Sequence, residues 1–126
     1  MLGEADLVAF VGSRDLQVSD NFYGERLGLR LLEASAFANV YDAGAAQLRV
    51  TLVDELAAAR HTVLGWRVGD ILATIRALCE AGVAFERYPG MSQDDDGVWN
   101  APGGSRIAWF ADPYGNILSL QQPPRG

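Results

Sequence analysis

The stretch Asp112-Pro113-Tyr114-Gly115-Asn116 separates two short, largely apolar runs, Arg106–Phe110 and Ile117–Gln121. Proline at the second position of a β-turn and glycine at the fourth are typical of a type I turn followed by a left-handed residue. The two flanking runs have the length and apolar content of strands. The sequence therefore predicts a β-hairpin near the end of the chain.

The residues before this hairpin predict a β-α-β-β-β order for the second half of the chain. Thr62–Val68 is predicted to be a strand, and Asp70 is a favourable N-cap for a helix. That helix is predicted to end at Gly82 and to be followed by a strand over Val83–Tyr88. The segment Pro89–Gly104 is predicted to be a long loop, and loops of this length are usually functional.

The first half repeats the same order. A strand is predicted at Leu7–Val11, and a helix follows Asp15 and ends at Gly28. Three more strands are predicted, at Leu29–Glu33, Phe37–Tyr41 and Gln47–Val53. We therefore expect residues 1–126 to form a single α+β domain of two tandem βαβββ modules, about 5–53 and 62–122, with a linker at about 54–61.

Composition excludes several classes of function. The chain has 126 residues and a net charge of −6, and its ten basic residues are all arginine. An acidic balance argues against a nucleic-acid partner, and the absence of lysine excludes Schiff-base chemistry. Cys79 alone cannot form an intramolecular disulfide, and no apolar run is long enough to span a membrane. These observations predict a soluble, cytoplasmic protein with no nucleic-acid or membrane partner.

The duplicated pattern resembles the vicinal oxygen chelate superfamily, which includes glyoxalase I, bleomycin resistance proteins and extradiol dioxygenases. The resemblance covers about residues 5–122 and implies a curled mixed sheet with a concave cleft, helices outside, and a homodimer. It is carried by Asp15-Leu16, Phe22-Tyr23 and Leu27-Gly28-Leu29 in the first half, and by residues 112–116 with Leu118-Ser119-Leu120 in the second.

The resemblance also implies where metal ligands would lie. Four inward strand positions usually hold the ligands, and here they are occupied by Val8, Arg49, Val63 and Ser119. None of these is a usual donor to zinc, iron or nickel, and a guanidinium repels a cation. We therefore expect no catalytic metal and no other cofactor.

Strand alternation then identifies the side chains that would line the cleft. Successive side chains point to opposite faces, so apolar residues such as Leu48 and Leu118 face the helices. Arg49 and Arg67 would bind an anionic or carbonyl oxygen of a ligand, or pair with an acidic neighbour such as Glu86. The ligand-binding candidates are Phe10, Gln47, Arg49, Thr51, Arg67, Trp99, Ser119 and Gln121.

Two further groups admit a functional and a structural interpretation. His61 is either a general base or an unpartnered residue of the linker. The acidic run Asp94–Asp96 is either the rim of a site for a cationic ligand or a solvated loop tip. No catalytic residue is identified.

The preferred hypothesis is a metal-free small-molecule-binding protein of the glyoxalase/bleomycin-resistance type. One alternative is an enzyme of the same superfamily, a lyase, isomerase or dioxygenase with unorthodox active-site residues. A third possibility is an interaction module with an empty cleft.

Overall fold

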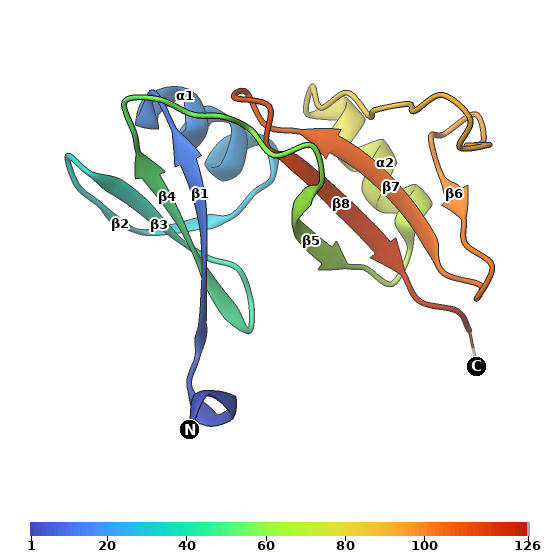
Figure 1. Ribbon diagram of the computed structural model, residues 1–126, viewed down its shortest axis with the longest axis horizontal. Helices are drawn as coiled ribbons and strands as arrows, with labels where there is room; N and C mark the ends of the chain where they lie inside the picture. Colours follow the sequence, from blue (N-terminus) through green and yellow to red (C-terminus); the bar gives the residue numbers. More distant parts are fainter. Residues whose placement is uncertain (126) are drawn as a thin grey trace. The chain divides into compact units, whose positions relative to one another are not determined.

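The computed structural model describes residues 1–125. The chain divides into two compact units, Met1–Ala58 and Ala59–Gly126 (Figure 1). Each unit contains one four-stranded mixed sheet with a helix packed on one of its faces. The expected α+β fold of two tandem βαβββ modules is thereby confirmed.

The first unit begins with a short 3-10 turn, η1 (Leu2–Glu4), and then forms its sheet in the order β1-β4-β3-β2. Strands β1 and β4 are parallel, whereas β4, β3 and β2 pair in antiparallel fashion. The elements are β1 (Leu7–Ser13), α1 (Leu16–Asp20), the π-helical turn η2 (Asn21–Arg26), β2 (Arg30–Ala34), β3 (Ala38–Asp42) and β4 (Ala46–Leu52).

The helical segment of this unit begins and ends where the sequence predicts. The Asp15 carboxylate accepts hydrogen bonds from the backbone N–H groups of Gln17 and Val18, as an N-cap does. At the other end Gly28 adopts a φ of 75°, and the next N–H donates to the carbonyl of Tyr23. Between them the helix widens into η2, which the sequence did not predict.

A buried polar cluster joins this helical segment to β3. Asn39 donates to the carbonyl of Leu16 and to the hydroxyl of Tyr41, which donates to Asp20 Oδ1 at 2.7 Å. Burial, together with the hydrogen bond to Asp20 and its charge, raises the pKa of Tyr41. The cluster fixes the helical segment against one face of the first unit's sheet. The other face carries no helix of that unit.

The second unit has the sheet order β5-β8-β7-β6, in which β5 and β8 are parallel and the other pairs are antiparallel. Asp70 caps its helix, as predicted, by accepting a hydrogen bond from the N–H of Ala73. The elements are β5 (Thr62–Arg67), α2 (Ile71–Glu80), β6 (Trp99–Asn100), β7 (Arg106–Ala111) and β8 (Ile117–Gln122).

The predicted strand over Val83–Tyr88 is wrong. Only an isolated bridge joins Phe85 to Phe110, and the fourth strand of the sheet is instead β6, within the segment predicted to be a loop. The reason is the Gln93 side chain, which accepts from the N–H of Tyr88 and donates to the carbonyl of Glu86. These side-chain bonds occupy backbone groups that a continuing strand would need.

The hairpin predicted around residues 112–116 is confirmed. The N–H of Gly115 donates to the carbonyl of Asp112, and Gly115 has the left-handed φ of 83°. The Asp112 carboxylate also accepts from the backbone N–H groups of Tyr114 and Asn116. Within residues 1–125 no helix is long and apolar enough to cross a membrane.

Candidate functional site

The face of the first sheet opposite α1 is called the helix-free face here. Tyr41, Leu48 and Val50 are buried on the helix side, so the residues that alternate with them lie on the helix-free face. Phe10 pairs with Arg49, Arg49 with Val40, and Val40 with Glu33, in register. One row of side chains therefore crosses all four strands on this face.

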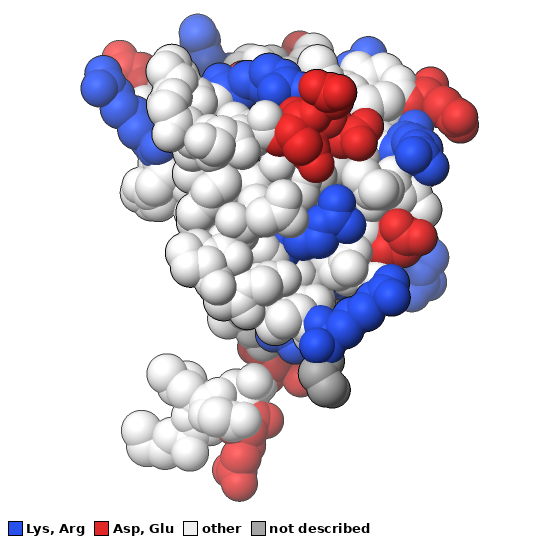
Figure 2. All heavy atoms as spheres, turned by 90° about the vertical axis from the view of Figure 1, so that its right-hand side faces the viewer, with Lys and Arg blue, Asp and Glu red and all other residues white. Residues whose placement is uncertain are grey.

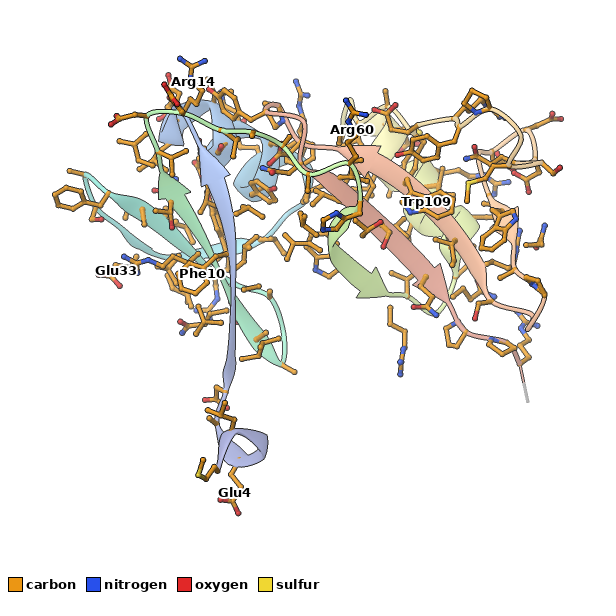
Figure 3. All side chains as sticks on the ribbon, in the orientation of Figure 1. Glu4, Phe10, Arg14, Glu33, Arg60 and Trp109 are labelled. Atoms are coloured by element: carbon orange, nitrogen blue, oxygen red, sulfur yellow. The ribbon has the colours of Figure 1, made fainter. Side chains whose placement is uncertain are left out.

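A cavity of about 340 Å³ lies along this row and is called the Arg49 pocket. Phe10 is 63% exposed, and its side chain and that of Glu33 lie on the same side of the sheet, one from β1 and the other from β2 (Figure 3). The pocket is lined by Val8, Phe10, Glu33, Val40, Gln47 and Arg49. Three predicted site residues, Phe10, Gln47 and Arg49, therefore share one pocket.

Arg49 is partly buried in this pocket without a counter-ion. Among residues 1–125 the only ion pair joins Arg30 to Asp42 at 3.1 Å, so neither Arg49 nor Arg67 pairs with Glu86. The contact with Arg30 and the N–H of Gly44 lower the pKa of Asp42. The guanidinium of Arg49 has no such partner within the described residues and is free to bind an oxyanion.

A second hollow of about 630 Å³ continues from the Arg49 pocket toward the start of β1 and β4. The two share Val8 and Gln47, and the larger one also contains the side chains of Asp6 and Asp42. The accessible part of the helix-free face is therefore elongated along the two parallel strands, with Arg49 at the end away from Asp6.

Thr51 lies on the same face but outside the pocket. It pairs with Gly12, and a Cβ on Gly12 would lie 2.8 Å from Leu56 Cδ1, so the segment after β4 covers this end of the sheet. Thr51 Oγ1 is buried and lacks a hydrogen-bond partner within residues 1–125. The structure thus separates Thr51 from the other three predicted residues of the first unit.

The second sheet also has a face without a helix, and aromatic side chains dominate it. The ring centroids of Trp99 and Trp109 are 6.2 Å apart at 33°, and Tyr88 contacts Trp109 edge-on at 5.7 Å. Trp109 Nε1 donates to Thr62 Oγ1 at 3.1 Å, which holds the indole in place. Burial and the charge of Glu86 raise the pKa of Tyr88. Trp109 and Tyr88 join the predicted Trp99 in one partly exposed aromatic surface.

Ser119 lies next to this surface. It pairs with Trp109 on one side and with Gly65 on the other, and a Cβ on Gly65 would lie 2.8 Å from Ser119 Oγ. The register of β5 slips between Thr62 and Leu64, so Thr62 lies opposite Ile117. The resemblance implies an inward position for Val63, and strict alternation along β5 from that position does not allow for this bulge.

Arg67 and Gln121 pair with each other at the end of the second sheet. Arg67 is exposed and lines a separate cavity of about 470 Å³ with Gly69 and the segment Gln122–Arg125. The structure therefore brings Trp99 and Ser119 close to the aromatic surface, but it gives Arg67 to a different pocket.

His61 and the acidic run Asp94–Asp96 both lie outside the Arg49 pocket. His61 is exposed and makes no hydrogen bond or ion pair with another residue of the described chain. The Asp94 carboxylate accepts from the N–H groups of Asp96 and Val98, so the run forms an ordered turn. The view from the second unit's side shows acidic and basic groups interspersed, with no continuous acidic field (Figure 2).

The donor set does not fit the metal that the resemblance implies. Within residues 1–125 no three His, Cys, Asp or Glu side chains lie close enough to hold an ion. The positions that would supply ligands carry two valines, an arginine and a serine. The residues of this chain therefore give no basis for a metal-dependent step.

Comparison with known proteins places the fold. No protein-family model and no curated protein sequence matches the chain. The chain is similar to solved structures of a glyoxalase/bleomycin resistance protein/dioxygenase from Alicyclobacillus acidocaldarius (19% identity, TM-score 0.73, covering 95% of this chain and 92% of that one). It is likewise similar to a lactoylglutathione lyase from Agrobacterium tumefaciens (16%, 0.71, 94% and 93%) and to a glyoxalase/bleomycin resistance protein from Catenulispora acidiphila (20%, 0.72, 94% and 98%). At these identities the likeness concerns the fold alone. The chain therefore has the fold of the glyoxalase, bleomycin resistance and dioxygenase structures, the vicinal oxygen chelate fold.

Proposed function

We propose that this chain is a small-molecule-binding protein whose ligand lies in the Arg49 pocket. The observation that carries the proposal is a partly buried guanidinium that forms no ion pair in residues 1–125 and lines a cavity with both apolar and polar side chains. Arginine is rarely buried unless it is paired, because removing its charge from water costs free energy. A bound anionic or carbonyl oxygen would supply the missing partner.

The rest of the pocket suits a small organic molecule. Gln47 offers an amide donor and acceptor, and Val8, Phe10 and Val40 offer apolar surface. A small number of polar groups placed beside apolar side chains is typical of ligand sites. The similar structures include a lactoylglutathione lyase, whose name indicates a small organic substrate.

The binding role is proposed without a metal because the donor set does not fit one. No specific observation favours a lyase, isomerase or dioxygenase activity, and that alternative stays a prediction. The homodimer and the cytoplasmic location also stay predictions. Light scattering on the purified chain tests the first, and fractionation of the source cells tests the second.

A thermal-shift screen tests the proposal. A library containing carboxylates, zwitterions, cations, neutral aromatics and divalent metals is added to the wild type and to Arg49→Gln. A ligand at one hundred times its Kd stabilises the native state by about 2.7 kcal/mol, so true ligands raise the unfolding midpoint measurably. Compounds with an anionic oxygen should shift the wild type and not the variant.

Arg14→Gln is the matched control, because Arg14 is exposed just after β1 and outside the pocket (Figure 3). It removes the same charge and should leave every shift unchanged. Hits that act equally on all three proteins, or a library without hits, would refute the proposed function.

A further inference from the structure

The Arg49 pocket contains a second charge of opposite sign. Glu33, from β2, lines the same cavity and forms no ion pair within residues 1–125. Between them stands Val40, which pairs in register with each. Because adjacent strands are roughly 4.8 Å apart, the two backbone positions lie roughly 10 Å apart across the sheet.

The two charges therefore face one cavity without contacting each other. Both side chains are long enough to meet across that distance, yet no contact forms, and an exposed ion pair gains little because water screens it. A ligand that carries both charges can bind each group and displace water from the space between them. A ligand with one charge leaves the other group facing it unpaired.

The apolar part of the pocket lies to one side of this charged pair. Phe10, on β1, pairs in register with Arg49 on β4. Val8 lies two residues before Phe10 on the same face of β1. A volume of about 340 Å³ accommodates roughly ten non-hydrogen atoms at the ~30 Å³ that a water molecule occupies. This is the size of an amino acid with a large apolar side chain.

We propose that the ligand is a small zwitterion, with a carboxylate, an ammonium group and an apolar body. Arg49 donates two hydrogen bonds to the carboxylate, and Glu33 accepts from the ammonium group. The apolar body packs on Phe10 and Val8. This inference rests on the proposed function and adds the chemical class of the ligand.

Three probes of one shape test the assignment of charge. L-Phenylalanine carries both charges, 3-phenylpropanoate only the carboxylate, and 2-phenylethylamine only the ammonium group. Their Kd values are measured by calorimetry on the wild type, Arg49→Gln, Glu33→Gln and the control Arg14→Gln. Circular dichroism verifies that each variant is folded.

We expect the wild type to bind phenylalanine ~10-fold more tightly than either singly charged probe, the gain of one charge-assisted hydrogen-bonded contact. In Arg49→Gln phenylalanine should bind only as well as the amine does. In Glu33→Gln it should bind only as well as the carboxylate does. The control should behave as the wild type.

The failures of the two proposals are distinguishable. If 3-phenylpropanoate matches phenylalanine and Glu33→Gln changes nothing, the zwitterion is wrong, while a site that depends on Arg49 stands. If none of the three probes binds the wild type, the zwitterion is overturned, and hits of the thermal-shift screen that Arg49→Gln abolishes still support the proposed function. If those hits too are indifferent to Arg49→Gln, both proposals fail.

Discussion

Replacing Asp112 by alanine should destabilise the second unit more than the other substitutions considered in the turn of its final hairpin. The side chain is buried, with 5% of its surface exposed. Its carboxylate accepts from the N–H of Tyr114 at 2.9 Å, from the N–H of Asn116 at 3.0 Å and from Asn116 Nδ2 at 2.7 Å. Alanine removes these three contacts together.

The magnitude follows from which donors water can reach. Tyr114 is partly exposed, so its N–H can bind water instead, whereas Asn116 is 5% exposed and its N–H and Nδ2 lose the carboxylate where water has little access. A hydrogen bond to a charged group contributes about 1.5–3 kcal/mol, so the loss of two buried ones gives about 3–6 kcal/mol. Asp112→Asn keeps one acceptor oxygen and should lose less. Pro113→Ala, at an exposed position of the same turn, should change stability by under about 1 kcal/mol.

Tryptophan fluorescence measures the unfolding of the second unit, which contains Asp112. All three tryptophans, Trp66, Trp99 and Trp109, belong to residues 59–126. Urea unfolding followed by their emission therefore reports the second unit, and far-UV circular dichroism reports both. The expected order of destabilisation is alanine, then asparagine, then the proline control. A loss below about 1 kcal/mol for Asp112→Ala would refute the assignment of the turn's stability to this carboxylate.

Three further outcomes are expected. Gly65→Ala places a Cβ 2.8 Å from Ser119 Oγ and should lower the free energy of unfolding in urea by about 1–3 kcal/mol. Adding Ser119→Ala to this variant should restore part of that stability, and an unchanged loss would contradict the importance of the contact. The fold raises the pKa of Tyr41, so the contribution of its neutral hydroxyl to stability is present below the ordinary pKa of 10.0 and is lost as pH rises through the raised pKa. Between about pH 9 and about pH 11 the unfolding free energy of Tyr41→Phe should therefore fall less steeply with pH than that of the wild type. Equal slopes for the two proteins would contradict this. Leu56→Ala should speed tryptic cleavage within 54–61, since Leu56 packs over the sheet, and an unchanged rate would show that the segment is not held there.

Local signals explain why the sequence predicts most of the fold. Asp15 and Asp70 cap their helices through bonds to N–H groups two or three residues away, and residues 112–116 form their turn among themselves. Such interactions depend on neighbouring residues in the chain, so they can be read from the sequence. The duplication of the pattern then indicates the fold.

The wrong strand shows the limit of this reasoning. Residues Val83–Tyr88 have the composition of a strand, but strand formation requires a partner along the whole edge. The Gln93 side chain bonds to this segment and Trp99 pairs with Ile107 instead. No local pattern reports which of two segments gains an edge of a sheet.

The candidate site was predicted in part for the same reason. Alternation placed Phe10 and Arg49 on one face, and the register makes them neighbours. The position of Glu33 in this row could not be predicted, because it depends on the pairing of Glu33 with Val40 after a bulge in β2. Trp109 is the partner of Ser119 in register, so the alternation of the hairpin places both on the same face.

Residue-specific NMR tests the central claim most directly. The ¹⁵N-labelled wild type and Arg49→Gln are titrated with each compound that raises the unfolding midpoint in the thermal-shift screen. In the wild type we expect saturable chemical-shift changes at the amides of β1, β4 and Glu33, and only small changes in α1. In Arg49→Gln the changes at β1, β4 and Glu33 should be lost. Shifts that avoid β1 and β4, or that persist unchanged in Arg49→Gln, would contradict binding in the Arg49 pocket.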